Sequence, residues 1–143
     1  ALDAIKQLST IKDKIVIMPN TLCHIDCPSI HHWFPSDERP FIQAKDCMIL
    51  TDNEGYIKKC GFVLSEHLYL FDNYVGGYKL QGREYPTNFM KKVCETYFER
   101  KSASDILFFL LGDEIGYRLF EEMQHMTPEE YYNTKTKDII DVL

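Results

Sequence analysis

The chain has 143 residues and a formal net charge of −6, with 16 Lys and Arg set against 22 Asp and Glu. Hydrophobic residues make up 45% of the sequence and aromatic residues 13%, which excludes a disordered chain and is enough for one core. No run approaches 18 apolar residues, so no membrane span is expected. The acidic balance disfavours RNA as a partner. We therefore expect a single domain of the α+β class over residues 1–143.

The first forty residues are predicted to form a helix, a short strand and an irregular loop. Apolar residues recur every third position between 2 and 11, which indicates a short helix. The β-branched stretch KIVIM at 14–18 predicts a strand that ends at Pro19. Residues 19–40 hold four of the six prolines together with several His and Cys, which is typical of an irregular segment.

Residues 41–85 are predicted to form a small antiparallel β-meander or half-barrel. Short aromatic and β-branched runs alternate there with turn residues such as DNEG. The apolar run SDILFFLL at 104–111 fits a buried strand or a buried helix, and the prompt stop at Gly112 favours a strand over 105–111. A strand would complete a β-rich core over 41–111. A helix would instead give a three-stranded sheet backed by a helical bundle.

The remainder of the chain is predicted to be helical, over residues 112–143 and in the segment after Pro86. In FMKKVCETYFER, Phe89, Val93 and Phe98 indicate a buried helical face. The sequence Thr127-Pro128-Glu129-Glu130 has a capping Thr, a Pro in the first turn and acids at the positive end of the helix dipole. We expect a helix to begin there.

One candidate metal site lies in the Pro-bounded loop. Thiolates and imidazoles are the ligands that zinc prefers, and four of them suffice for a closed tetrahedral site. The candidate ligands are Cys23, Cys27, His31 and His32. Their spacing matches no common zinc finger, so the alternative is a His-rich loop without metal. Apart from zinc, no cofactor is expected.

The remaining chemistry-bearing residues favour packing or surface roles. His67 is predicted to lie in a turn between two strands without a functional role. Tyr69, Tyr74 and Tyr78 lack interleaved Arg and Lys, which favours packing or interface positions over stacking on bases. An active enzyme with His67 or His31 as base and Cys60 as nucleophile stays open, although no spacing requires it.

The stretch IQAKDCMILTDNEGYIKKCGFVLSEHLYLFDNYVGG resembles the opening strands of the picornavirus 3C-like cysteine proteases, which have the chymotrypsin fold. In that family a strand beginning with Gly-Phe ends on the catalytic His, and an acid opens a later strand. The resemblance places Tyr74 at the position of the His and Asp105 at that of the acid. It implies the N-terminal barrel half of such a protease, of viral origin and located in the host cytoplasm.

Two departures from this family imply that the chain does not cleave peptides. A Tyr cannot replace imidazole as a base at neutral pH, and the nucleophile motif G-x-C-G is missing, since no Cys follows Cys94. We therefore expect a non-catalytic pseudoenzyme that binds a protein partner or, less favourably, RNA.

Two other interpretations remain. EGYIKK followed by FVLSEHLYLF also resembles the first strands of a pleckstrin-homology domain, although its basic lipid-binding loop is thin here. The chain is alternatively a small α+β protein-interaction module unrelated to proteases, with or without stabilising zinc.

The five Cys are mostly unclustered and the chain starts with a charged, amphipathic segment unlike a secretory leader. Both features predict a cytoplasmic protein with free thiols.

Overall fold

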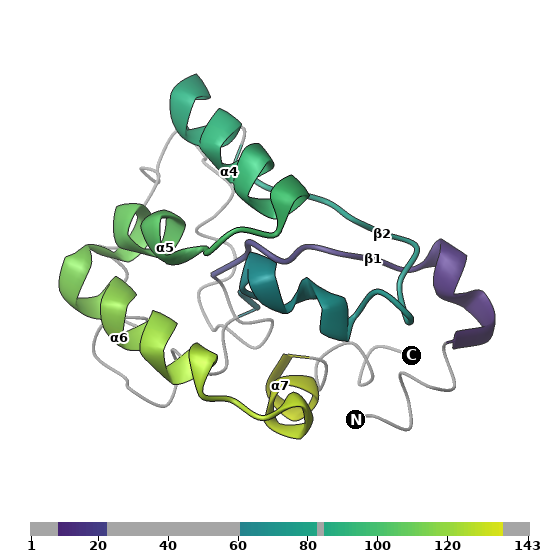
Figure 1. Cartoon of the computed structure of the whole chain (residues 1–143). Coiled ribbons are helices and arrows are strands. Elements are labelled where there is room, and N and C mark those ends of the chain that lie inside the picture. Colours follow the sequence, from purple (N-terminus) through teal and green to yellow (C-terminus); the bar gives the residue numbers. More distant parts are fainter. Residues whose placement is uncertain (1–8, 23–60, 83–84, 136–143) are drawn as a thin grey trace, which may run out of the picture.

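The computed structural model of the chain describes residues 9–22, 61–82 and 85–135 (Figure 1). Within these ranges helices predominate and two short strands pair, so the coarse expectation of a mixed helix-and-strand protein is confirmed. The elements in chain order are η1 (Ser9–Lys14), β1 (Val16–Ile17), η4 (Ser65–Leu70), β2 (Gly77–Tyr78), α4 (Thr87–Glu99), α5 (Ser104–Leu111), α6 (Asp113–Gln124) and α7 (Pro128–Lys135).

The two strands form a parallel pair that joins distant parts of the sequence. Val16 lies opposite Gly77 and Ile17 lies opposite Tyr78. The pairing is extended by the N–H of Lys79, which donates to the carbonyl of Ile17 at 2.9 Å. The short strand predicted at 14–18 is thus confirmed, but its described partner runs parallel to it.

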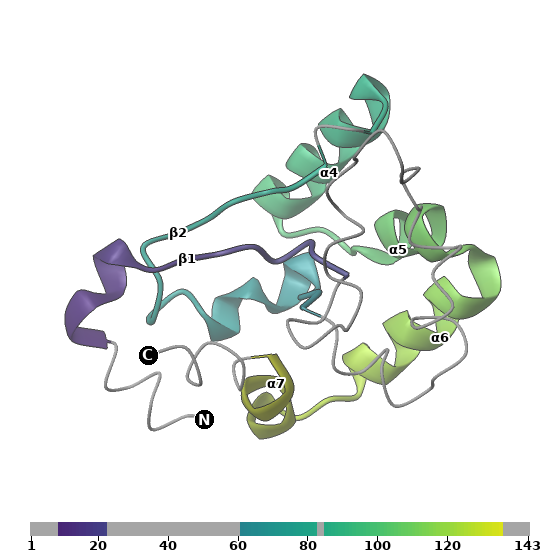
Figure 2. The same ribbon diagram turned by 180° about the vertical axis from the view of Figure 1, so that it is seen from behind.

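The helices pack around this pair and enclose the core. Both views show α4 on one side of the strands and η4 on the other, with η4 between the strands and α7 (Figures 1 and 2). Helices α5 and α6 form a closely packed hairpin. Most of the large, fully buried side chains come from η4 and its flanks and from each of the α-helices in the described residues: Phe62, Leu64, Leu68, Val93, Ile106, Leu107, Leu119, Met123 and Tyr131.

The strand expected over 105–111 is wrong, because these residues belong to α5. The buried positions are Ile106, Leu107, Leu110 and Leu111, and the spacing of one, three and one residues follows a helical face. A carboxylate also supports the helix start: Glu66 accepts a hydrogen bond from the N–H of Ala103 at 3.0 Å.

The meander expected over 41–85 is also wrong at Ser65–Leu70, which form the 3-10 helix η4. The buried apolar residues in and next to this helix are Leu64, Leu68 and Phe71. Their spacing of four and three residues follows the helical period rather than the two-residue period of a strand. The expected strands at 41–60 lie outside the described residues, as does most of the helix predicted near 2–12. In the described part of that helix, η1 is interrupted by a non-helical Ile11.

Helix α7 begins where the sequence predicts. The N–H of Glu130 donates to Thr127 Oγ1 at 3.2 Å, and the N–H of Thr127 donates to Glu130 Oε2 at 2.8 Å. This reciprocal pair is a capping box, and Pro128 occupies the first helical position.

Among the described helices, none combines the length and the apolar character needed to cross a bilayer.

Candidate functional site

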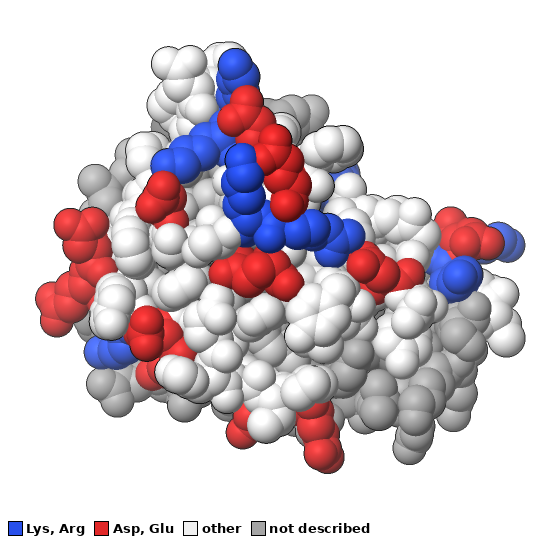
Figure 3. All heavy atoms as spheres, viewed as in Figure 1, with Lys and Arg blue, Asp and Glu red and all other residues white. Residues whose placement is uncertain are grey.

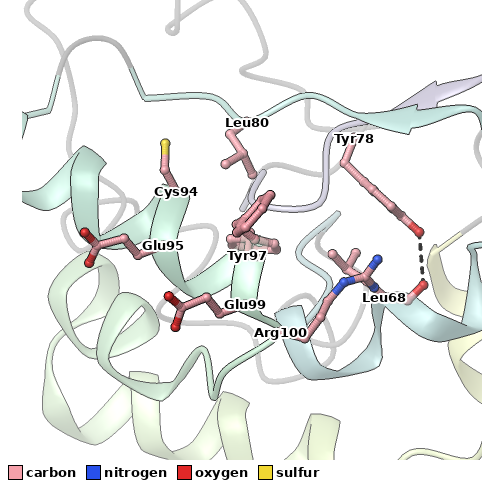
Figure 4. Close-up of a pocket in the computed structure, with 9 residues that line it drawn as sticks. Leu68, Tyr78, Leu80, Cys94, Glu95, Tyr97, Glu99 and Arg100 are labelled. Carbon is pink, nitrogen blue, oxygen red and sulfur yellow. Dashed lines mark hydrogen bonds between the residues drawn. The ribbon is translucent and has the colours of Figure 1, made fainter.

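A groove of about 660 Å³ lies between the C-terminal half of α4 and the segment that runs from η4 through β2 to Leu80 (Figure 4). The side formed by η4 and β2 contributes Leu68, Tyr78 and Leu80. The residues that line the groove from α4 and its last turn are Cys94, Glu95, Tyr97, Phe98, Glu99 and Arg100. The groove therefore combines aliphatic, aromatic, acidic and basic side chains.

The floor of the groove is held rigidly by Tyr97. This residue is 5% exposed, and its hydroxyl donates to the carbonyl of Val63 at 2.8 Å. Its ring meets Phe62 edge to face at a centroid distance of 6.5 Å. Figure 4 shows the side chain of Leu80 pointing toward the ring of Tyr97, and both line the floor. An apolar group that enters here meets a surface already fixed by the core.

The rim of the groove carries an aromatic side chain that is almost fully in water. Phe98 is 89% exposed, whereas the helical pattern of the sequence predicts that it is buried. The prediction for Val93 on the same helix is confirmed, since that side chain is 1% exposed. Exposure of a whole phenyl ring beside an apolar groove is unfavourable in water and is typical of a binding surface.

Two of the lining residues, Tyr78 and Arg100, belong to a polar network centred on Asp72. Tyr78 donates its hydroxyl to Asp72 Oδ1 at 2.7 Å and lies 3.0 Å from the carbonyl of Leu68. Arg100 Nη2 donates to the same Asp72 oxygen at 2.9 Å, and its guanidinium lies 5.4 Å from the centre of the Tyr78 ring. Arg100 ends α4 in the left-handed conformation, with φ 56°.

The network fixes the protonation states of its members. Burial raises the pKa of Tyr78, and the hydrogen bond to Asp72 and its charge raise it further, so the phenol keeps its proton. Burial acts to raise the pKa of Asp72, but the hydrogen bonds from Tyr78 and Arg100 outweigh it and lower the pKa. Asp72 is therefore an anion that neutralises the charge of Arg100.

Cys94 exposes a free thiol to the groove. Among the described lining residues none is a histidine, so no imidazole lies there to act as its base.

His67 lies in η4 rather than in a turn between strands. Its ring packs edge to face on Tyr131 of α7 at a centroid distance of 5.1 Å and on Tyr69 at 6.5 Å. Burial lowers the pKa of His67, partly offset by the charge of Glu66. Nδ1 is buried without a hydrogen-bond partner among the described atoms, so the neutral ring serves packing.

The residues singled out by the protease resemblance lie in different settings from those it implies. Tyr74 lies in the turn that follows η4, where its N–H donates to the carbonyl of Phe71 at 2.8 Å. Asp105 is exposed in the first turn of α5 and accepts a hydrogen bond from Lys92 Nζ at 2.6 Å. Both elements are helical or turn structure where the resemblance implies strands.

The predicted zinc ligands Cys23, Cys27, His31 and His32 lie outside the described residues, as do the alternative catalytic residue Cys60 and its possible base His31. Within 9–22, 61–82 and 85–135, no three His, Cys, Asp or Glu side chains gather closely enough to hold a metal ion.

Comparison of the chain with protein-family models, with curated proteins and with solved structures finds no match.

Part of this site was predictable from the sequence. Tyr78 belongs to the tyrosine group that the sequence assigns to packing or interface positions, and it lines the groove. The exposure of Phe98 was not predicted, since the sequence pattern placed this residue on a buried face. Phe98 directly follows Tyr97 on α4, and the helix turns by about 100° between the two, so that Tyr97 faces the core while Phe98 points into solvent.

Proposed function

We propose that this chain is a non-catalytic interaction module that binds a segment of a protein partner in the groove beside α4. The observation that carries the proposal is the combination of an apolar floor, made by Leu68, Leu80 and Tyr97, with the nearly fully exposed ring of Phe98. Interfaces concentrate binding energy in aromatic residues that a partner desolvates. A protein partner is favoured over RNA, since Glu95 and Glu99 line the groove and would repel phosphates.

Binding through this groove requires no protease ancestry. The helices at Ser65–Leu70 and Ser104–Leu111 stand where the protease resemblance implies strands. The proposal is therefore the interaction module itself, in a reducing cytoplasmic setting that suits the free thiol of Cys94.

The test uses a random library of 12-residue peptides displayed on phage and panned against the full chain. Peptides that are retained are synthesised, and their dissociation constants are measured for the wild type and for Phe98→Ala. We expect the substitution to weaken binding about tenfold or more, because truncation of a residue that dominates an interface costs about 2 kcal/mol or more and tenfold corresponds to about 1.4 kcal/mol. Since the ring is 89% exposed, the variant should keep its folded stability.

Tyr117→Ala is the matched control. Tyr117 lies on α6, is 57% exposed and does not line the groove. Its removal should change peptide affinity less than about twofold. Retention of no peptide, or equal affinity of all retained peptides for wild type and Phe98→Ala, contradicts the proposed function.

A further inference from the structure

Two carboxylates follow each other along the groove wall. Glu95 and Glu99 are one helical turn apart on α4, and their side chains are 57% and 46% exposed. Residues four apart on a helix lie about 5–6 Å from each other, so the two charges form one acidic strip. Figure 4 shows both side chains extending from the same side of α4.

The one basic residue among the described lining residues is already neutralised. Arg100 is paired with Asp72 at 2.9 Å and stacked over Tyr78, and the pKa of Asp72 is lowered, so this carboxylate stays charged. Among the lining residues, the net charge that a ligand encounters is therefore the negative charge of Glu95 and Glu99.

Two lysines outside the groove, both well exposed to solvent, pair with these carboxylates. Lys91 Nζ lies 3.9 Å from Glu95, with its side chain 75% exposed, and Lys101 pairs with Glu99 with its side chain 68% exposed. Figure 3 shows acidic and basic side chains alternating at the top of the view, where Figure 1 places α4. Exposed ion pairs contribute about 0–1 kcal/mol, so a cation from a ligand can replace either lysine at little cost.

We propose that the groove takes a cationic amphipathic peptide segment, with Lys or Arg placed to meet Glu95 and Glu99 and an aliphatic or aromatic side chain placed on Leu80 and Tyr97. The inference rests on the proposed function and names the chemistry of its partner. The apolar floor supplies contact area, and the acidic strip selects the charge of the segment. The net charge of −6 attracts such a segment over a longer range.

The test takes the peptides from the display selection that lose affinity for Phe98→Ala. We expect these peptides to be enriched in Lys and Arg over Asp and Glu. Their affinity should fall as salt rises from 50 to 300 mM, because added ions screen exposed charges. Glu95→Lys combined with Glu99→Lys should weaken them tenfold or more, and Glu95→Gln combined with Glu99→Gln should weaken them by a smaller factor.

The matched control combines Glu114→Lys with Glu129→Lys. Both residues are exposed, lie on α6 and α7 outside the groove and give the same change in net charge. This control should keep affinity within about threefold. Each variant is first checked for a cooperative thermal transition, so that a loss of binding is not a loss of folding.

Charge-swapped peptides, with Glu in place of each Lys or Arg, complete the test. Their affinity for the Glu95→Lys, Glu99→Lys variant should be higher than their affinity for the wild type. Phe98-dependent peptides that are acidic or neutral, or that bind this variant and the wild type equally, overturn the inference and leave the proposed function standing. The absence of any Phe98-dependent peptide overturns both.

Discussion

His67 illustrates how a single side chain couples two elements. Its ring packs on Tyr131, which is 0% exposed and accepts a hydrogen bond from the N–H of Leu64 at 3.3 Å. Tyr131 thus holds helix α7 against η4 through ring contacts with His67 and Phe71 and through its hydroxyl. The contact is apolar on the side of His67, because Nδ1 has no partner among the described atoms.

This contact makes the stability of the fold dependent on pH. Burial lowers the pKa of His67 below its usual value of 6.5, so the unfolded chain binds a proton at a higher pH than the folded chain does. Protonation of His67 in the unfolded chain therefore lowers the free energy of unfolding as the pH drops below 6.5, and it has no such effect well above that value. His67→Phe keeps a ring on Tyr131 and cannot titrate, so we expect a smaller decrease between pH 7.5 and 5.5.

Urea unfolding at the two pH values measures the effect. His125→Gln is the control, because the side chain of His125 is 81% exposed at the end of α6. It should keep the pH dependence of the wild type. An equal loss of stability on acidification in the wild type and in His67→Phe would show that His67 does not cause it.

At the scale of elements, α5 and α6 depend on one close approach. A Cβ atom at Gly116 would lie 2.8 Å from the carbonyl oxygen of Leu107, which is backbone and has little room to move. Gly116→Ala would gain about 1 kcal/mol of helix propensity. The clash would cost about 1–3 kcal/mol, as is common when atoms are added to a packed core.

We therefore expect Gly116→Ala to lower the free energy of unfolding by about 1 kcal/mol, and by no more than about 2 kcal/mol, measured by urea denaturation. Gly77→Ala is the control, since a Cβ there meets nothing within 4 Å. It should leave stability within about 0.5 kcal/mol of the wild type. A stability gain in Gly116→Ala would mean that propensity prevails and that the two helices lie further apart.

The elements also show which parts of the fold are readable from sequence. Helix α7 was predictable because its capping box lies within four residues, Thr127 to Glu130. Helix α5 was not, because the carboxylate at its start belongs to Glu66, which precedes Ala103 by 37 residues. The same Glu66 accepts a hydrogen bond from Gln124 at the end of α6, at 2.8 Å. Local patterns contain no information about such long-range partners.

At the scale of the whole molecule, the groove is a product of long-range pairing. Parallel pairing sets β2 beside β1, about 60 residues earlier in the chain, and β2 in turn carries Tyr78 to the groove opposite Arg100. No sequence spacing predicts that meeting. The sequence did provide the residue types, since tyrosines without interleaved basic residues indicated packing or interface positions.

Binding in this groove is tested most directly by nuclear magnetic resonance with the ¹⁵N-labelled full chain and a peptide that requires Phe98. We predict that the largest amide shift changes fall on 94–100 and on 78–80, with smaller changes elsewhere in the described residues. If the largest amide shift changes fall on α6 or α7 and the amides of 94–100 keep their chemical shifts, binding in the groove is contradicted.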